Sequence, residues 1–332
     1  MDPIIEISHI TKKYHIIKHR SGMIGTAKDI FKPRTDDIAA VEDLSFRVGK
    51  GEILGLIGPN GSGKSTTIKM LTGILKADEG RILVMGKEPF DSRKQLMLHM
   101  GVMFGQKSQL WWDIPLINSY ELLRDIYRIE KREFQRNLDE LTEYLGLEGL
   151  LDKPVREMSL GQRMRSEIAA IFIHDPDIVI LDEPTIGLDI VVKKSIREYI
   201  KRHNRKHGTT VLLTTHDMND IASLCENIVV INKGKKIYEG AIRQIKENID
   251  SVSKLVVILE NGPDAREKME KMGFEAEEIL QEDGKTNIEY SIHLKKHDIN
   301  GVFQMLHDYR LKTVRIEEPT FEDMIGRLFL EG

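Results

Sequence analysis

The glycine-rich stretch at residues 58–66, Gly-Pro-Asn-Gly-Ser-Gly-Lys-Ser-Thr, constrains the fold of this chain more than any other feature. It matches the spacing G-x-x-x-x-G-K-[ST]. A short apolar run at residues 53–57 precedes it, and a helix-compatible run at residues 65–71 follows it. Because this order is strand, glycine-rich turn and helix, it predicts a loop that holds a phosphate with backbone N–H groups and the positive end of the helix dipole. In such a loop Lys64 reaches the β- and γ-phosphates, and the Ser65 hydroxyl ligates Mg²⁺.

Two acidic residues, Asp182 and Glu183, follow the wholly apolar run at residues 178–181. A run with no polar face is typical of a parallel strand covered on both sides, and α/β sheets bind ligands at the carboxyl ends of such strands. Asp182 suits Mg²⁺, and Glu183 suits a base that polarises an attacking water. Alone, the pair is equally compatible with two solvated acids at a strand end. Its combination with the phosphate loop favours the metal and base roles.

The other candidate residues carry weaker signals. Residues 159–162, Ser-Leu-Gly-Gln, precede a helix-compatible run and predict either an anion site at the helix start or an ordinary N-cap. His216 follows an apolar strand at residues 210–213, where a lone histidine is usually structural. Gln106, Asp189 and Tyr14 are not informative individually.

Composition places few limits on function. The 332-residue chain has a net charge of −4, so bulk charge gives no indication of a nucleic-acid partner. Its single cysteine, Cys225, excludes an internal disulfide and suits a cytoplasmic protein. We see no signal peptide, and no apolar run reaches the roughly 18–20 residues needed to cross a bilayer. Any membrane role therefore requires a partner.

The predicted fold class is α/β, with a P-loop NTPase core over residues 1–240 and a helical subdomain inserted at about 110–165. Residues 4–10 read as an edge strand, and residues 15–38 lack a clear strand pattern. A short helix and linker at 241–253 precede a second domain at 254–332. Its βαββαβ order, with one further helix, predicts a small ferredoxin-like α+β domain.

Together these pieces resemble the ATP-binding subunits of ABC transporters over roughly residues 4–240. Residues 58–66 match the family's Walker A loop, and residues 178–183 match Walker B with its catalytic glutamate. Residues 158–162, Met-Ser-Leu-Gly-Gln, match the signature, normally Leu-Ser-Gly-Gly-Gln, with Leu160 replacing the first glycine. The remaining family motifs match at Gln106 (Q-loop), residues 187–189 (D-loop) and His216 (switch histidine), in the family's order.

The resemblance implies that two subunits face each other head to tail and bind ATP and Mg²⁺ between them. ATP on Walker A of one subunit touches the signature of the other, while Tyr14 stacks on adenine. Glu183, His216 and Gln106 are implied as catalytic, and Ser65, Gln106 and Asp182 as metal ligands. The implied nucleotide contacts are Tyr14, Gly58, Pro59, Asn60, Gly61, Ser62, Gly63, Lys64, Ser65, Thr66, Ser159, Gly161, Gln162 and Asp189.

The resemblance also implies partners. These are an integral membrane permease and a second ATP-binding subunit, either a second copy or a close relative, with the chain peripheral on the inner face of the cell membrane. Residues 318–323, Glu-Pro-Thr-Phe-Glu-Asp, resemble the C-terminal stretch of drug-resistance-type exporters, which favours export. The alternative is a soluble ABC ATPase acting on nucleic acid or ribosomes. One ATP domain and no sustained heptads argue against it, so we expect no nucleic-acid partner.

Three hypotheses concern segments outside these motifs. Trp111 and Trp112 form part of the permease groove, or else pack in the core of the helical subdomain. Residues 23–31 form an amphipathic helix against the permease or bilayer, or else a surface insertion packed on its own domain. The C-terminal domain is regulatory or stabilises the dimer, because it carries no catalytic constellation.

Overall fold

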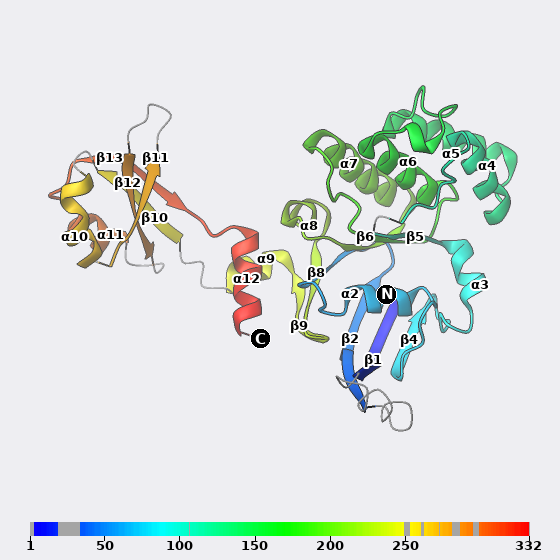
Figure 1. Ribbon diagram of the computed structural model, residues 1–332, viewed down its shortest axis with the longest axis horizontal. Coiled ribbons are helices and arrows are strands. Elements are labelled where there is room, and N and C mark those ends of the chain that lie inside the picture. Colours follow the sequence, from blue (N-terminus) through cyan, green and yellow to red (C-terminus); the bar gives the residue numbers. More distant parts are fainter. Residues whose placement is uncertain are drawn as a thin grey trace, which may run out of the picture. The chain divides into compact units, whose positions relative to one another are not determined.

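The computed structural model describes residues 3–18, 34–105, 107–248, 253–259, 262–271, 273–280, 286–294 and 299–331. The chain divides into two compact units, Met1–Ala241 and Ile242–Glu331. Figure 1 shows the first with two sheets and a group of helices, and the second with one sheet. Each unit has a hydrophobic core of its own.

A six-stranded sheet forms the centre of the first unit, in the order β5-β6-β7-β3-β8-β9. Pairing is parallel except between β8 and β9, which form an antiparallel hairpin. Residues 178–181 of β6 are fully buried, as the apolar run predicts. Because β3, β6 and β7 are parallel, the residues that follow them emerge at one edge of the sheet. The strands are β3 (Ile53–Ile57), β5 (Met100–Phe104), β6 (Ile178–Asp182), β7 (Thr210–Thr214), β8 (Asn227–Asn232) and β9 (Lys235–Ala241).

A second, antiparallel sheet has the order β2-β1-β4, formed by β1 (Pro3–Lys18), β2 (Arg34–Gly49) and β4 (Glu79–Val84). The prediction of an edge strand at residues 4–10 is wrong, because β1 pairs with β2 on one side and β4 on the other. The ladder also continues from His15↔Asp37 to Lys18↔Arg34, inside the segment predicted to lack strands. Register shifts break the alternation of side chains that sequence reading depends on. The predicted helix at residues 23–31 lies outside the described residues.

The helices of the first unit gather beside the six-stranded sheet (Figure 1). On α5 the buried residues Phe134, Leu138, Leu141 and Leu145 recur at helical spacing, and Gly146 ends the helix in a left-handed conformation with φ 59°. The fully buried Tyr120 of α4 donates its hydroxyl to the Ser166 carbonyl of α6 at 3.0 Å, which joins the two helices. The helices are α2 (Lys64–Leu71), α3 (Arg93–Leu96), η1 (Met97–His99), α4 (Leu116–Tyr127), α5 (Lys131–Leu145), η2 (Val155–Glu157), α6 (Leu160–Phe172), α7 (Ile190–His207) and α8 (Met218–Leu224).

The second unit has the predicted βαββαβ order, in an antiparallel sheet ordered β11-β12-β10-β13. Its core is built from alternate residues of β10, Leu255, Val257 and Leu259, packed with Met269 and Tyr290. The elements are α9 (Ile242–Asn248), β10 (Ser253–Leu259), α10 (Gly262–Lys271), β11 (Glu275–Leu280), β12 (Thr286–Leu294), α11 (Ile299–Met305), β13 (Leu311–Glu317) and α12 (Phe321–Glu331). Among the described residues, none of the helices has the length and apolar character to cross a membrane.

Candidate functional site

The glycine-rich loop joins the end of β3 to the start of α2. A side chain at Gly58 would collide with the Ile231 carbonyl, and one at Gly63, where φ is 106°, would collide with the Ala40 carbonyl. Both positions therefore require glycine. A turn after β8 supports the loop, because the Gly234 N–H donates to the Ser62 carbonyl at 3.0 Å.

The side chains of the loop leave polar groups available inside it. The Lys64 ammonium donates to the carbonyls of Gly58 at 2.5 Å and Pro59 at 3.1 Å. Its positive charge therefore lies inside the loop. Burial lowers the pKa of Lys64, while the nearby Glu183 and Asp182 carboxylates act to raise it. The Ser62 hydroxyl is buried without a hydrogen-bond partner in the described part of the chain. An enclosed cation and an unpaired donor fit a phosphate ligand.

Asp182 ends β6 beside the start of α2. The Ser65 hydroxyl donates to its Oδ2 atom at 3.4 Å, and the Thr214 hydroxyl of β7 donates to its Oδ1 atom. A carboxylate and a hydroxyl from two separate elements thus meet at the mouth of the loop. These are the hard oxygen ligands that Mg²⁺ prefers, so Ser65 and Asp182 fit a magnesium site.

Glu183 stands in a strained turn directly after Asp182, with φ of 56°. Its N–H donates to the Thr214 carbonyl at 2.9 Å, which fixes the turn against β7. Its Oε1 atom lies 3.2 Å from His216 Nε2, and Oε2 accepts the His216 N–H at 3.3 Å. Burial raises the pKa of Glu183, although His216 and Lys64 act to lower it. A carboxylate with raised proton affinity is suited to general-base chemistry.

His216 connects this carboxylate to the phosphate loop. Its Nε2 atom lies 2.9 Å from Asn60 Oδ1 as well as near Glu183, and the ring is 48% exposed. The structure therefore brings the acidic pair, His216 and the loop together at the carboxyl edge of the sheet. Of the predicted loop residues, Gly58, Ser62, Gly63 and Lys64 are buried, Thr66 is half-buried, and Pro59, Asn60, Gly61 and Ser65 are exposed.

The predicted signature residues begin a different element, α6. Ser159 caps this helix by accepting the Gln162 N–H at 3.3 Å, and Gln162 Oε1 accepts the Ser159 N–H at 3.0 Å. Asp189 likewise caps α7, accepting the Val192 N–H at 2.9 Å. The two helix starts adjoin each other, because Gly161 lies against Val192.

Comparison with known proteins decides the family. The family model for ABC transporters matches residues 41–186. The chain is 31% identical over 218 residues to the ABC transporter ATP-binding protein NatA of Bacillus subtilis (strain 168), an alignment covering 66% of this chain and 88% of NatA. The chain belongs to the ABC transporter ATP-binding proteins.

Two further relatives of this ABC ATPase are informative. The Nod factor export ATP-binding protein I of Burkholderia thailandensis is 36% identical over 239 residues, covering 72% of this chain and 77% of that protein. The dimeric structure of a post-hydrolysis state of the ATP-binding cassette MJ0796, bound to ADP and Pi, matches with a TM-score of 0.59 and 25% identity, covering 71% of this chain and 98% of that chain. Both the predicted family and its P-loop core are confirmed, and the chain is an ATP hydrolase.

Two predicted residues of the ABC ATPase are not placed in this cluster by the described residues. Tyr14 is 38% exposed on β1 opposite Ile38, two residues along β2 from Ala40, which contacts Gly63 of the loop. Gln106 lies outside the described residues. Their predicted contacts with adenine and with Mg²⁺ stay predictions.

Sequence reasoning missed two polar residues that support the site. Thr214 anchors both the Asp182 side chain and the Glu183 backbone, but a threonine ending an apolar strand carries no distinctive signal. Glu167 is 4% exposed within α6, where it accepts the Gln109 N–H at 3.0 Å and the Ser108 hydroxyl. An acid directly before the apolar run at residues 168–173 was the visible signal for it. Glu167 ties the segment just after Gln106 to the helix that Ser159 begins.

Proposed function

We propose that this ABC ATPase hydrolyses ATP with Mg²⁺ between two facing ATP-binding subunits and thereby drives a separate membrane permease. The observation that carries the proposal is the meeting of Lys64, Asp182, Glu183 and His216 at one edge of the sheet. An enclosed cation, a hydroxyl–carboxylate pair and a carboxylate of raised pKa are the groups that phosphoryl transfer to water requires.

Each group has a proposed role. The loop N–H groups and Lys64 hold the phosphates, and Ser65, Gln106 and Asp182 hold Mg²⁺, which neutralises charge on the phosphates when bound. Glu183 orients and deprotonates the attacking water. His216, 2.9 Å from Asn60 and 3.2 Å from Glu183, positions the water or the terminal phosphate between them. Tyr14 stacks on the adenine.

The second subunit supplies Ser159, Gly161, Gln162 and Asp189 to the first subunit's nucleotide. Apolar residues surround these helix starts. Ile190 is 80% exposed and Val191 77%, and Leu160 is 39% exposed next to Gly187. Such exposed apolar side chains mark protein interfaces. A second copy or a close relative is the proposed occupant, in keeping with the dimeric MJ0796 structure.

The permease is proposed to contact the helical subdomain near Trp111 and Trp112. Their exposures of 41% and 48% support this over the alternative that they pack in the core of the helical subdomain. Arg163 of α6, the residue after Gln162, lies 5.5 Å from the centre of the Trp112 ring. A permease contact at Trp112 would therefore lie against Arg163, which directly follows the signature. Export is the proposed direction, as in the Nod factor relative, with the chain on the cytoplasmic face of the membrane.

We further propose that residues 1–240 form the ATP-binding domain, with the helical subdomain at about 110–165, and that residues 254–332 form an accessory domain. The division into two units at Ala241 supports this organisation. Helix α9 occupies the first part of the 241–253 segment. The accessory domain is proposed to stabilise or regulate the ATPase dimer.

The test is affinity purification of tagged Glu183→Gln protein from native membranes solubilised in detergent with ATP and Mg²⁺. The substitution removes the base and keeps the nucleotide contacts, so ATP-bound dimers accumulate. We expect recovery of a membrane protein with several spans. Trp112→Ala in the same background should lower that recovery without lowering ATP binding, while an Ile126→Ala control on the exposed face of α4 should not.

Recovery of only soluble proteins or nucleic acid would contradict the transport proposal while leaving the ATPase intact. Failure of Glu183→Gln to retain ATP, or undiminished hydrolysis by that variant, would contradict the assignment of the base.

A further inference from the structure

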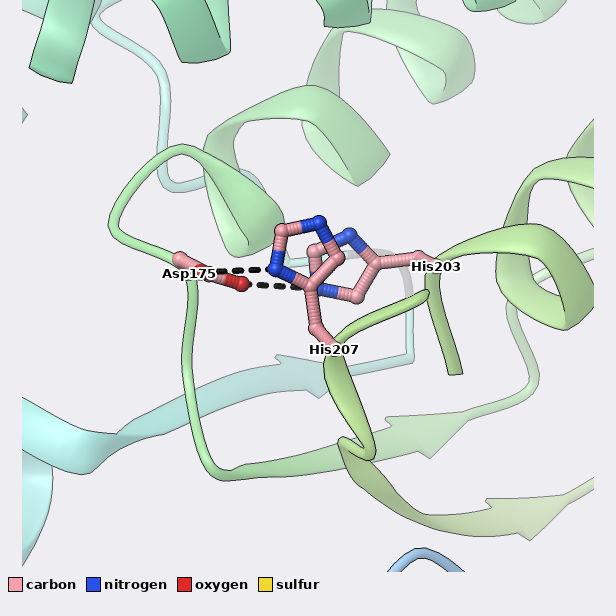
Figure 2. Close-up of side chains that lie close together, drawn as sticks. All are labelled: Asp175, His203 and His207. Carbon is pink, nitrogen blue, oxygen red and sulfur yellow. Dashed lines mark hydrogen bonds and ion pairs between the residues drawn. The ribbon is translucent and has the colours of Figure 1, made fainter. Parts of the chain in front are cut away.

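A polar cluster lies at the opposite end of β6 from the nucleotide site. His203 and His207 are one turn apart near the end of α7, and Asp175 stands in the turn between α6 and β6. Figure 2 shows both imidazole rings directed toward the Asp175 carboxylate. His207 Nδ1 lies 2.8 Å from Oδ2, and His203 Nε2 lies 3.2 Å from Oδ1. One ligand atom from each of the three residues lies within 4.8 Å of the other two.

We propose that Asp175, His203 and His207 form a binding site for a divalent transition-metal ion of the zinc class. Two imidazole nitrogens and one carboxylate oxygen are a ligand set that such ions take, with a water in the fourth position. In a tetrahedral zinc site, bonds of about 2.0–2.1 Å place neighbouring ligand atoms about 3.3 Å apart. The 3.2 Å separation of His203 Nε2 and Asp175 Oδ1 already has that value.

His203 Nε2 and Asp175 Oδ1 lie 3.2 Å apart but without the geometry of a hydrogen bond. His203 is 5% exposed, and among the described residues neither atom has a hydrogen-bond partner. Buried polar atoms in native proteins are nearly always paired, so such a pair needs an explanation. A cation bound between the two atoms satisfies both, because each offers it a lone pair.

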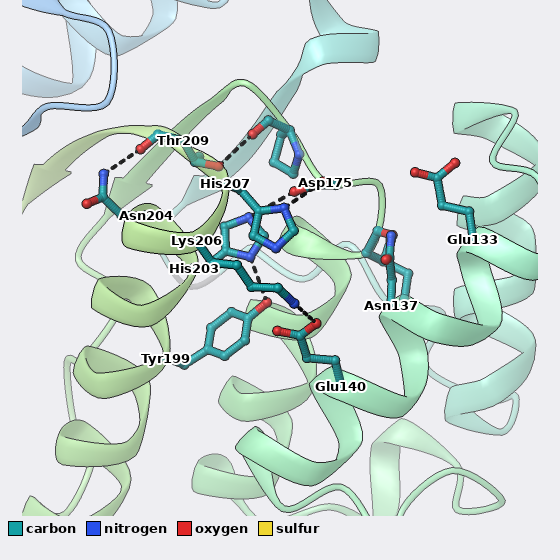
Figure 3. A network of polar contacts seen from close by, with 12 residues as sticks. Glu133, Asn137, Glu140, Asp175, Tyr199, His203, Asn204, Lys206, His207 and Thr209 are labelled. Carbon is teal, nitrogen blue, oxygen red and sulfur yellow. Dashed lines mark hydrogen bonds and ion pairs between the residues drawn. The ribbon is translucent and has the colours of Figure 1, made fainter.

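The surroundings hold these ligands in place. The Tyr199 hydroxyl lies 3.3 Å from His203 Nδ1, so it fixes the ring from the side away from Asp175, as the outer partner of a metal-bound histidine does. The rings of His203 and His207 are stacked, 4.4 Å apart at 10°. Figure 3 shows these groups within one polar network. The turn holding Asp175 is itself anchored, because Thr209 donates to the Pro176 carbonyl at 3.0 Å.

The local charge also favours a cation. The C-terminal end of a helix carries a partial negative charge, and His207 is the last residue of α7. The neighbouring Lys206 is paired at 2.5 Å with Glu140 of α5 (Figure 3), so a carboxylate offsets its charge.

A bound ion would join the end of α7 to the start of β6. At the other ends of these elements, Asp189 caps α7 and Asp182 ends β6, and both belong to the proposed nucleotide site. The proposed metal site is independent of the proposed ATPase mechanism, since it shares no residue with it.

The experiment titrates Co²⁺, a spectroscopic substitute for Zn²⁺, into full-length protein freed of metal and nucleotide. Four-coordinate cobalt absorbs visible light strongly and six-coordinate cobalt weakly, which separates this site from an oxygen-rich Mg²⁺ site. We expect one equivalent of strongly absorbing Co²⁺, displaced by Zn²⁺. His207→Ala, which alters a solvent-accessible residue, should weaken binding at least tenfold, and Asp175→Asn should do the same.

Two matched variants should leave the strongly absorbing Co²⁺ signal unchanged. His99→Ala removes a histidine that pairs with Asp177 at 2.9 Å on a neighbouring element, and Asp182→Asn removes a carboxylate of the nucleotide site. The proposal is overturned if wild-type protein shows no strong absorption, or if His207→Ala binds Co²⁺ as tightly as wild type.

Discussion

The two ends of strand β6 carry polar clusters of opposite construction. At its carboxyl end, Asp182 and Glu183 meet a loop whose nine residues are continuous in sequence. Just before its amino end, Asp175 contacts two histidines that lie one helical turn apart. No sequence motif indicates these three residues. The first cluster is open and strained, with Glu183 at φ 56°, whereas the second has a nearly buried histidine braced by Tyr199. The carboxyl end is suited to exchange of a ligand. The amino end is suited to holding α7 against the turn that precedes β6.

The largest expected effect separates the two ends by activity. Glu183→Gln should lower ATP hydrolysis by roughly 10²–10⁴-fold, because a positioned base contributes about that factor. His207→Ala, which alters the cluster at the amino end, should leave the rate within about twofold. Steady-state phosphate release measures both rates. A comparable loss in His207→Ala would mean that the two ends are not functionally distinct.

A second substitution tests the strained geometry of the loop. Gly63→Ala should cost about 1–3 kcal/mol in unfolding free energy and abolish tight nucleotide binding, because φ there is 106° and a side chain meets the Ala40 carbonyl. Gly61→Ala is the matched control. It also has positive φ, at 79°, but beyond its two chain neighbours no atom of the described residues lies within 4 Å of the added carbon. A cost of about 1 kcal/mol is therefore expected. Urea unfolding and nucleotide titration distinguish the two; equal effects would show that the close approach at Gly63 is unimportant.

The exposed apolar side chains near the D-loop sharpen the contrast, since the proposed dimer would cover them. Val191→Asp in the Glu183→Gln background should weaken ATP-dependent dimerisation roughly tenfold, because a charge would be buried at the interface. Its 77% exposure predicts unchanged monomer stability. Sedimentation velocity with ATP measures the dimer, and Ile126→Asp, at 56% exposure on α4, is the control. Dimerisation that survives Val191→Asp would place the interface elsewhere.

The smallest effect concerns Glu167 of α6, a helix that lies in the sequence between Ser159 of the signature and Asp175 of the amino-end cluster. Burial raises the pKa of its carboxyl group, although hydrogen bonds from Ser108 and Gln109 act to lower it. The folded state therefore holds this proton to higher pH than the unfolded state, and the contribution to stability falls as pH rises through the raised pKa. Wild type should gain unfolding free energy relative to Glu167→Gln between pH 7 and pH 5. Denaturant titrations at both values, with Glu121→Gln on α4 as control, measure the difference; a change of opposite sign would contradict the burial effect.

Prediction from sequence succeeded where chemistry is written in adjacent residues. The glycines of the loop are required by backbone conformation, and the apolar run before Asp182 reports a buried parallel strand, so both were readable. It failed at β1, where register shifts near Ile10 break the alternation of side chains. Thr214 and His203 depend on contacts between segments far apart in the chain. No local pattern encodes such contacts, and His203 was found only from the structure.

The position of β3 in the sheet has a consequence for how the protein is made. This early strand lies between β7 and β8, and Gly234, beyond β8, donates to the Ser62 carbonyl of the loop and accepts the Glu42 N–H. When the phosphate loop of a nascent chain has just emerged from the ribosome, β7, β8 and Gly234 have not yet been released. The loop then lacks both flanking strands and the hydrogen bonds of Gly234. Competence to hold ATP therefore emerges late in translation, and shortened chains ending before Thr210 should contain the loop sequence without the two flanking strands and the Gly234 contacts.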